Sequence, residues 1–311
     1  MFGFEKTKLG DYAVYRFSYP DGSPAFSVAP ERGVVLLDLF FDRRNVLDGY
    51  QTPDELREGK WGKSALLFPF PNRLADGRYT WNGAEYRFPI NNPDTGNAIH
   101  GFARHEIFEV ESLTLARHYA SLTCCFVYSG HYDAYPFPAQ VDVRYEMYVG
   151  GLFRVWFRAR NLNTFAIPMG FGWHPYFRVS ERAADASLML PPCSRIPLSE
   201  RMIPAGEASP YAEYAEMRPL AGARLDDCFC VSDDRELWRI RLEGAYGQLS
   251  IEAETAQFPF FQVFTPPHGE SVALEPMSCN INAFNNGDGL YILAPDETWE
   301  AGVAIRFAAK R

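Results

Sequence analysis

The chain has 311 residues, of which 47% are hydrophobic and 15% aromatic, and this composition is enough to bury a substantial core. It carries 39 acidic residues against 30 lysines and arginines, which gives a formal net charge of -9. This charge argues against a nucleic acid or an anionic membrane as partner, because both require a basic surface. No stretch approaches the roughly 20 apolar residues that a membrane-spanning helix needs.

The amino terminus and the cysteines indicate a cytoplasmic protein. Residues 1–8 contain no apolar segment of the kind found in secretory signals. Neither the adjacent Cys124 and Cys125 nor the pair Cys228 and Cys230 has the CxxC spacing of a zinc or redox motif. Consecutive side chains of a strand point to opposite faces, so Cys124 and Cys125 are not expected to form a disulfide. We therefore expect reduced thiols that behave as small apolar side chains.

Most apolar runs are short, aromatic or β-branched, and closed by Gly, Pro, Asn or Asp, which is typical of an all-β protein. The Asn82-Gly83 dipeptide lies between two such runs and predicts a hairpin with a two-residue type I′ turn. No flexible linker, repeat or low-complexity tract interrupts the pattern, so we expect one domain over residues 1–311, a large β-sandwich. The segments expected to form strands are 33–41, 79–81, 84–88, 106–115, 119–128 and 299–308.

The segment 141–160 predicts a second hairpin and its register. Apolar residues occupy alternate positions on both sides of the Gly-Gly pair at 150–151. A two-residue turn there would mix apolar and charged faces, whereas an odd-length loop keeps them apart. We therefore predict that Val149 lies opposite Phe153 and that Tyr145 lies opposite Phe157.

Helical patterns are few. Residues 51–59 are long enough for one or two turns. Ser209 and Pro210 stand before the segment 211–218, as a capping residue and a proline at the first helical position would, so a short helix is predicted there.

His174 is the first candidate for a functional residue. It precedes Pro175, which favours an extended backbone and a side chain that projects sideways from a strand. Its aromatic neighbours Trp173 and Tyr176 would limit solvation of the imidazole and could stack against the apolar face of a sugar. The alternative is a core histidine whose hydrogen bond goes to a backbone carbonyl.

Glu275 follows the apolar run 272–274 and precedes Pro276, which cannot donate to a strand ladder. The strand is therefore expected to end here, with the carboxylate at the rim of a sheet. Apolar neighbours would partly desolvate the carboxylate, raise its pKa and make it a better base near neutral pH. The alternative is an exposed glutamate at the end of a strand.

Three further segments carry polar groups that suit a sugar. His100 lies in a segment rich in turn residues, where a surface position is the alternative. Arg73 follows the stiff apolar segment 68–71, and an ion pair with an acid is its alternative. Asp226 and Asp227 could accept hydroxyl groups or bind a metal ion.

Taken together, these segments resemble the aldose 1-epimerase (galactose mutarotase-like) superfamily. The resemblance extends from about residue 69 to the carboxyl terminus and depends on the order of the motifs rather than on any single one. It implies an antiparallel β-supersandwich with a sugar in an open cleft on a concave face, and neither a cofactor nor a metal ion. The similar segments are 71–79 with the Asn82-Gly83 hairpin, 89–92, 99–101, 174–177, 225–229, 273–276 and 293–297.

The resemblance also implies a role for each candidate residue. Glu275 corresponds to the general base that removes the proton of the anomeric hydroxyl, and His174 to the general acid that protonates the ring oxygen. His100 corresponds to a histidine that hydrogen-bonds the sugar near the ring oxygen. Arg73 and Asp226 correspond to residues that hold the sugar hydroxyls from opposite sides.

This mechanism requires particular protonation states of the two catalytic groups. The acid and the base must hold opposite protonation states at one pH, so we expect an ionised Glu275 and a charged His174. The two groups are expected to face each other across a sugar-sized gap, from segments a hundred residues apart.

The substrate is left open. The sequence after His100, residues 101–104, is similar to the hexose-6-phosphate mutarotase branch, which needs a cationic pocket because arginine matches phosphate bidentately. The segment 172–177 is instead similar to bacterial epimerase-like proteins of unassigned sugar. The candidates for the cationic pocket are Arg73, Arg78, Arg104 and His105.

Four functions are therefore considered. The first is a mutarotase of a free aldohexose or aldopentose, and the second acts on a phosphorylated or sulfonated sugar. The third is a sugar-binding or regulatory protein with the same fold, although a binder needs no paired acid and base. The fourth is a metal-dependent hydrolase that uses His100, His105 and the Asp226-Asp227 pair, whose spacing fits no zinc pattern. Whether the protein is a monomer or a homodimer is open.

Overall fold

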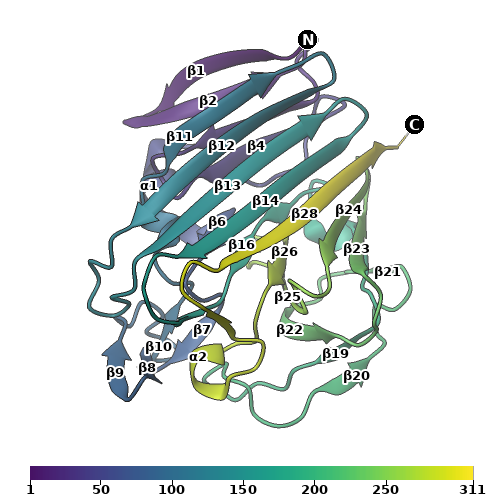
Figure 1. Cartoon of the computed structure of the whole chain (residues 1–311). Helices are drawn as coiled ribbons and strands as arrows, with labels where there is room; N and C mark the ends of the chain where they lie inside the picture. Colours follow the sequence, from purple (N-terminus) through teal and green to yellow (C-terminus); the bar gives the residue numbers. More distant parts are fainter. Residues whose placement is uncertain (311) are drawn as a thin grey trace.

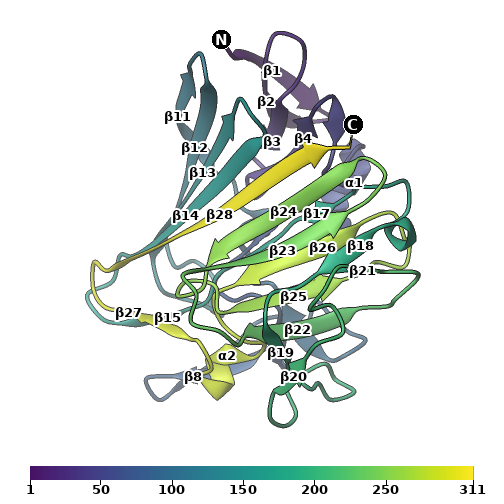
Figure 2. The ribbon, with the colours of Figure 1, turned by 90° about the vertical axis from the view of Figure 1, so that its right-hand side faces the viewer.

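The computed structural model describes residues 1–310, and the expectation of an all-β protein with few short helices is confirmed. The strands form six sheets, and every ladder between two of these strands is antiparallel. Figures 1 and 2 show two large sheets stacked as layers, with smaller sheets at their ends. Within residues 1–310, no helix is long and apolar enough to cross a membrane.

The largest sheet has nine strands and forms one layer of the sandwich. Its long central strands alternate apolar residues, which face the core, with charged residues, which face outward, as a half-buried sheet requires. In spatial order the strands are β11 (Glu109–Leu115), β12 (Tyr119–Tyr128), β13 (Ala139–Tyr148), β14 (Leu152–Asn161), β28 (Thr298–Ala309), β24 (Gly247–Glu254), β23 (Leu237–Glu243), β18 (Ser187–Met189) and β21 (Arg218–Pro219).

The second layer is an eight-stranded sheet. Its spatial order runs through β20 (Ser209–Tyr211), β19 (Cys193–Arg195), β22 (Asp226–Val231), β25 (Phe260–Phe264), β26 (Val272–Met277), β16 (Gly172–His174) and β6 (Ala65–Leu67), and β17 (Tyr176–Phe177) also pairs with β26.

Shorter elements complete the fold. A five-stranded sheet near the amino terminus contains β1 (Gly3–Leu9), β2 (Tyr12–Ser18), β3 (Ala25–Ala29), β4 (Val35–Phe41) and β5 (Arg44–Asn45). Three two-stranded sheets pair β7 (Arg73–Ala75) with β10 (Asn97–Ile99), β8 (Arg78–Trp81) with β9 (Ala84–Arg87), and β15 (Ile167–Met169) with β27 (Tyr291–Leu293). The helical segments are α1 (Pro53–Glu58), α2 (Ala283–Asn286) and the 3-10 turns η1 (Lys60–Gly62), η2 (Ala103–His105) and η3 (Ala183–Asp185).

Aromatic side chains fill the space between the two large sheets. Phe157 of β14 lies 5.0 Å from Phe171, which precedes β16, and Trp299 of β28 lies 5.2 Å from Phe171, measured between ring centroids. Phe26 of β3 packs against Phe153 of β14 in the same way, at 5.4 Å. The nine-stranded sheet is therefore covered on its inner face by both the eight-stranded and the five-stranded sheets.

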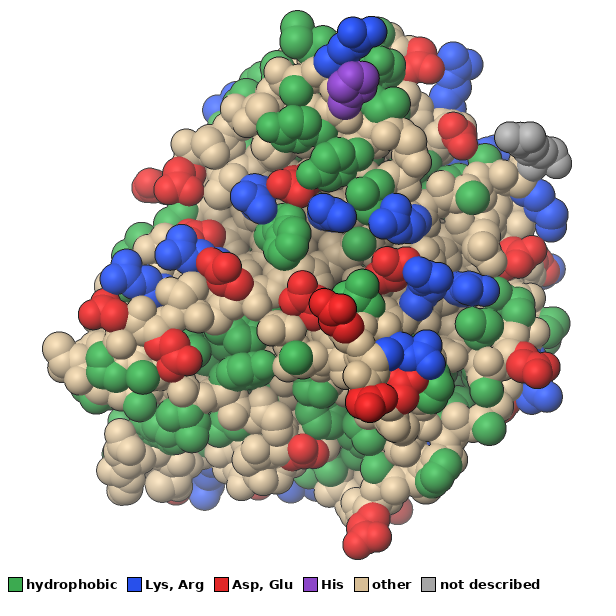
Figure 3. Space-filling view, turned by 45° about the vertical axis from the view of Figure 1, so that its right-hand side comes forward, with side chains coloured by type: hydrophobic (Ala, Val, Ile, Leu, Met, Phe, Trp, Pro, Cys, Tyr) green, Lys and Arg blue, Asp and Glu red, His purple; other side chains and the backbone are tan. Residues whose placement is uncertain are grey.

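The outer surface carries mixed charge. Figure 3 shows lysines and arginines interspersed with aspartates and glutamates rather than gathered into a field of one sign. Arg158 of β14, for example, lies within 3.6 Å of both Asp142 and Glu300 on the neighbouring strands. Such pairs at the surface contribute little to stability individually, but they leave no broad basic surface on this face.

Both predicted hairpins form, and one register differs. Asn82 and Gly83 have positive φ angles and connect β8 to β9, as a type I′ turn requires. The loop between β13 and β14 has the predicted odd length, but it consists of residues 149–151 instead of 150–152. Tyr145 consequently lies opposite Val155, not Phe157, and the predicted pairing of Val149 with Phe153 is wrong. The faces are unchanged, because the register moves by a whole residue pair.

The predicted helix after Ser209 is wrong. Residues 209–211 form β20, an edge strand in which Pro210 pairs with Ser194 of β19. Proline is tolerated on an edge because one side of the strand needs no donor. Tyr211 also packs its ring 5.0 Å from that of Phe229, and this tertiary contact outweighs the local helical pattern. In contrast, the helix expected within 51–59 is present as α1, and all six cysteines are free.

Candidate active site

Alternation along three strands places polar side chains on the face of the eight-stranded sheet that points away from the core. In β26, Leu274 joins the core and Glu275 points to the other face. In β16, Trp173 and His174 divide in the same way. Gln262 of β25 lies directly opposite Glu275, so it occupies the same face.

A cleft of about 440 Å³ opens on this face, within the range of small-molecule sites. All five residues predicted from the sequence to act on a sugar line it, namely Arg73, His100, His174, Asp226 and Glu275. The fold therefore brings into one cavity residues that lie up to 202 positions apart in the chain.

His174 and Glu275 meet at the floor of the cleft. The imidazole Nε2 lies 3.3 Å from a carboxylate oxygen of Glu275, and the two residues are only 5% and 1% exposed. We expected a sugar-sized gap between the two side chains. Instead, they are in direct contact. This closeness suits an acid and a base that act on one anomeric carbon, since the hydroxyl oxygen and the ring oxygen are both bonded to it.

The predicted rim position of Glu275 is wrong. Strand β26 continues through Pro276 to Met277, and the carboxylate is buried in the middle of the sheet. The Leu274 N–H donates to the carbonyl of Pro175 at 3.2 Å, and Pro276 points its ring nitrogen to that same side. The neighbouring strand is interrupted there, between β16 and β17, so the missing N–H breaks no ladder.

His174 is held by its surroundings. Its ring stacks on that of Tyr176, with 4.9 Å between centroids and 7° between planes. Its carbonyl accepts a hydrogen bond of 2.8 Å from the backbone N–H of Ser64. The Tyr176 hydroxyl donates to the carbonyl of Trp61 at 2.8 Å, so the stacking ring is itself anchored.

His100 is held in an unusual backbone conformation. It has a φ of +68°, and its Nδ1 accepts a hydrogen bond of 3.2 Å from the backbone N–H of Asn72. A neutral imidazole that accepts at Nδ1 carries its proton on Nε2, which can then donate to a ligand. Gly101 is required next, because its φ is +58° and a Cβ would lie 2.1 Å from the carbonyl oxygen of Phe68. His100 is thus buried rather than on the surface.

Arg73 and Asp226 form an ion pair on the wall nearer Glu275. An Arg73 nitrogen lies 3.3 Å from one oxygen of Asp226, and the side chain of Gln262 donates to the other at 2.6 Å. Asn72 joins this network by donating to Gln262 at 3.2 Å. The ion-pair alternative for Arg73 is therefore correct, but the pair lies in the cleft, where hydroxyl groups can reach it.

Burial moves the pKa values of the central groups toward their neutral forms. Desolvation raises the pKa of Glu275 well above 4.5, and nearby Asp226 acts in the same direction. Burial lowers the pKa of His174 to about 3, with the charge of Arg104 contributing. Burial, His174 and Arg104 similarly lower the pKa of His100. Burial of the two groups therefore opposes the expected ionised Glu275 and charged His174.

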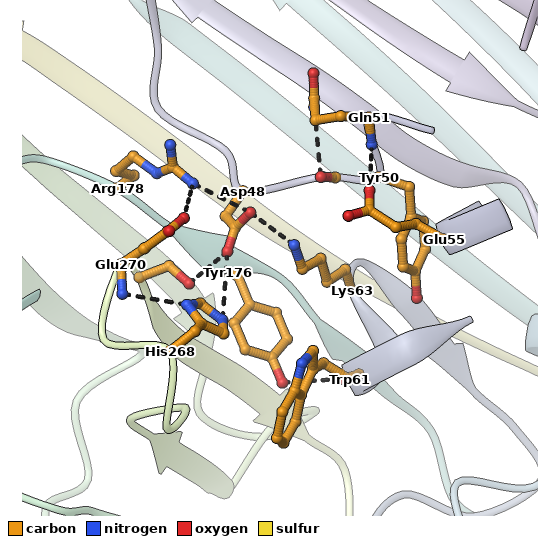
Figure 4. Close-up of polar contacts among 12 residues, drawn as sticks. Asp48, Tyr50, Gln51, Glu55, Trp61, Lys63, Tyr176, Arg178, His268 and Glu270 are labelled. Carbon is orange, nitrogen blue, oxygen red and sulfur yellow. Dashed lines mark hydrogen bonds and ion pairs between the residues drawn. The ribbon is translucent and has the colours of Figure 1, made fainter. Parts of the chain in front are cut away.

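A buried ion-pair network supports the site from behind, and Figure 4 shows it around Asp48. Asp48 is 5% exposed and accepts hydrogen bonds from Lys63 at 2.8 Å and Ser271 at 2.7 Å. Arg178 and His268 lie 3.3 and 3.8 Å from its oxygens. Burial opposes ionisation of Asp48, but the hydrogen bonds from Lys63 and Ser271 outweigh it and lower its pKa.

This network connects the segments that carry the central pair. Arg178 follows β17 just after His174, and Ser271 precedes β26, which carries Glu275. Lys63 belongs to the segment whose Trp61 carbonyl anchors Tyr176. Asp48 therefore fixes these three segments relative to one another.

Of the remaining candidate residues, one lines the cleft and the others do not. Arg104 lines the cleft, whereas Arg78 is exposed on the β8–β9 hairpin and does not line it. His105 is exposed beside Arg104. Asp227 lies outside the cleft lining and 3.9 Å from Arg195. Within residues 1–310 no three His, Cys, Asp or Glu side chains are grouped as a metal site would require.

Sequence reasoning missed three residues of the cleft. Asn72 connects His100 to Gln262, and Gln262 is the only polar residue in the apolar run 258–264. A single polar residue in an apolar run was the sequence feature that could have indicated a role for Gln262. Trp61 lies at the mouth of the cleft, 37% exposed and with a φ of +62°, between two glycine-containing segments. An exposed tryptophan in a sparsely populated backbone conformation often marks a functional position.

The stacked sheets and the histidine–carboxylate cleft define a galactose mutarotase-like β-sandwich. The family profile described as aldose 1-epimerase matches residues 27–306. The chain therefore belongs to the aldose 1-epimerase family.

Two solved structures share the fold of this chain, and one curated protein, described as uncharacterized, is similar to it in sequence. A galactose mutarotase-like protein from Clostridium acetobutylicum superposes with a TM-score of 0.87 at 19% identity, covering 100% of this chain and 99% of that one. Galactose 1-epimerase from Lactobacillus acidophilus NCFM gives 0.84 at 15% identity, with the same coverage. The Escherichia coli K12 protein YihR is 28% identical over 272 residues, which cover 84% of this chain and 83% of YihR.

Proposed function

We propose that this protein is a cofactor-independent aldose 1-epimerase that interconverts the α and β anomers of an aldose. The observation that carries the proposal is the contact of 3.3 Å between His174 Nε2 and Glu275 at the floor of the cleft. Mutarotation needs one group that accepts a proton and one that donates a proton, both at the anomeric centre. A buried imidazole and carboxyl in contact supply that pair.

Ring opening follows from the positions of the two groups. Glu275 takes the proton of the anomeric hydroxyl while the bond between C1 and the ring oxygen breaks and C1 becomes an aldehyde. His174 gives its proton to the departing ring oxygen. The aldehyde then rotates about its bond to C2, and the reverse proton transfers close the ring on the other face.

The pair needs to share one proton. Burial favours a protonated Glu275 beside a neutral His174. Moving that one proton to His174 gives the tautomer with an ionised Glu275 and a charged His174. Both forms hold one donor and one acceptor. A bound sugar brings hydroxyl groups to the carboxylate, and together with Arg73 these favour the ionised tautomer that ring opening uses.

The other polar residues hold the sugar. His100 donates from Nε2 near the ring oxygen, because its Nδ1 is already occupied by Asn72. The Arg73–Asp226 pair offers both donors and an acceptor to ring hydroxyls. Trp61, at the mouth of the cleft, presents an aromatic face against which a sugar can stack.

The test is the rate of anomer exchange, measured by saturation-transfer NMR on a panel of aldoses. We expect Glu275→Gln and His174→Asn each to lower this rate by about 10²–10⁴-fold, the usual contribution of a positioned acid or base. His118→Asn, which changes an exposed histidine outside the cleft, serves as the matched control and should retain the wild-type rate. Exchange at the wild-type rate in both cleft variants would refute the assignment.

The same experiment separates the alternatives. A sugar-binding protein without turnover would show saturable binding and no acceleration of anomer exchange. A metal-dependent hydrolase would lose its activity in excess chelator, whereas we expect anomer exchange to be unaffected by it.

A further inference from the structure

Arg104 lines the same wall of the cleft as His174. It lies in η2, directly after the turn at Gly101 that positions His100. Gly62 separates the two side chains, since a Cβ built on it would lie 3.7 Å from the imidazole of His174 and 3.8 Å from a terminal nitrogen of Arg104. The guanidinium therefore lies on the histidine side of the cleft, and the Arg73–Asp226 pair lies near Glu275.

The charge of Arg104 has no acidic partner. Within residues 1–310, no carboxylate lies within ion-pair distance of it, and its one side-chain hydrogen bond runs from Nε to His105 at 3.1 Å. Arg32 adds a second positive charge behind it, because its guanidinium donates to the Arg104 carbonyl at 2.6 Å. Arg32 also donates to the carbonyl of Leu56 and so holds this turn against α1.

The rest of the cleft does not neutralise this charge. Arg73 and Asp226 cancel each other, and Glu275 and the two histidines favour their neutral forms. Arg104 is partly buried. A partly buried cation without a counter-ion is costly, and a ligand that supplies the anion removes this cost. An uncompensated positive charge inside the cleft of a chain with net charge -9 thus points to an anionic ligand.

The connectivity of a pyranose ring fixes where that anion belongs. The ring oxygen, which His174 protonates, is bonded to C1 on one side and to C5 on the other. C5 carries the exocyclic C6, so a group on C6 extends from the ring-oxygen side, away from the anomeric hydroxyl at Glu275. Arg104 lies on that histidine side.

We propose that Arg104 binds a compact anionic group on C6 of the sugar, so that the substrate is an anionic hexopyranose rather than a neutral one. This inference rests on the proposed mutarotase function. A phosphate, a sulfonate and a carboxylate share the planar or tetrahedral oxyanion that a guanidinium fork matches with two hydrogen bonds. They are therefore one ligand chemistry with three sources.

The experiment compares anomer exchange of a neutral hexose with that of a hexose 6-phosphate, a 6-deoxy-6-sulfohexose and a hexuronate. In the wild-type protein, at least one anionic sugar should have a kcat/KM about 10- to 100-fold above that of the neutral hexose, as one charge-assisted pair provides. Arg104→Gln should remove that preference mainly through KM, and Arg104→Lys should restore part of it. Arg87→Gln, on the exposed β9 strand, is the matched control and should retain it.

The outcomes separate this inference from the function on which it rests. Fast exchange of neutral hexoses with no preference for any anionic sugar in the wild-type protein would overturn the inference and leave the mutarotase proposal standing. That comparison needs no variant, so it holds even if Arg104→Gln fails to fold. No exchange of any sugar would instead overturn the mutarotase proposal. Equal losses for neutral and anionic sugars in Arg104→Gln would also count against an anion site.

Discussion

At the scale of single residues, the site depends on burial acting in opposite directions on two touching groups. Burial raises the pKa of Glu275 and lowers that of His174, so it favours the neutral form of each side chain. The sequence indicated that Glu275 would be desolvated, because its neighbours are apolar. The residue pattern alone did not indicate that both groups share one cleft, since that depends on contacts between distant strands. Only the family resemblance implied it, and the direct contact of the two side chains was not expected.

These shifts predict opposite effects of pH on stability. Glu275 keeps its proton when folded to a pH above its ordinary 4.5, so the unfolded chain is favoured as pH rises above that value. Glu275→Gln removes this penalty. The free energy of unfolding of the variant, relative to that of the wild type, should therefore increase as pH rises, by up to about 1.4 kcal/mol per pH unit between about pH 5 and pH 7. Urea denaturation at several pH values measures the difference.

His174 should behave in the reverse sense. Its folded pKa of about 3 lies below its ordinary 6.5, so the unfolded chain binds the extra proton first as pH falls below 6.5. His174→Asn lacks this effect. Its free energy of unfolding, relative to that of the wild type, should therefore increase as pH is lowered from about 6.5 toward 5. Differences that stay flat with pH in both variants would show that neither group is held neutral.

At the scale of elements, alternation and turn chemistry could be read from the sequence, but pairing partners could not. The Asn82-Gly83 hairpin follows from a backbone that only such residues adopt easily. The β13–β14 loop was placed one residue late, because either position of a three-residue loop keeps the same faces together. The segment 209–218 has a local helical pattern that is overruled by pairing with β19, a partner 16 positions earlier.

The Asp48 network was also beyond sequence reasoning, because its members come from four separate segments. We predict that Asp48→Asn lowers the free energy of unfolding by about 3–5 kcal/mol, since it removes the buried counter-charge that Lys63 and Arg178 share and leaves the partly buried Lys63 ammonium unpaired. Anomer exchange should fall as well, because the strands that carry His174 and Glu275 lose a common anchor. Asp54→Asn is the control, since Asp54 pairs with Arg57 on the exposed face of α1 and should cost at most about 1 kcal/mol.

Urea denaturation of the two variants decides this point. Losses of similar size would mean that Asp48 is no more than another surface acid. A large loss of stability for Asp48→Asn with unchanged anomer exchange at low temperature would show that the network supports the fold but not the geometry of the site.

At the scale of the whole molecule, the sandwich brings together groups that are 101 positions apart in sequence. Packing of the eight-stranded sheet against the nine-stranded sheet turns Leu274 and Trp173 inward, and their neighbours Glu275 and His174 are thereby turned into the cleft. Strand alternation predicts that each pair of neighbours divides between faces. It does not say which faces meet, and the site was anticipated only because the order of its motifs resembled a known family.

The proposed mechanism requires His174 and Glu275 to act as one unit on the anomeric carbon. The direct test compares anomer exchange in Glu275→Gln, His174→Asn and the double variant by saturation-transfer NMR on the best substrate. Groups that share one proton should be non-additive, so the double variant should lose no more than about the larger single loss. Losses that instead multiply in the double variant would mean that the two residues act independently, and the shared-proton mechanism would be wrong.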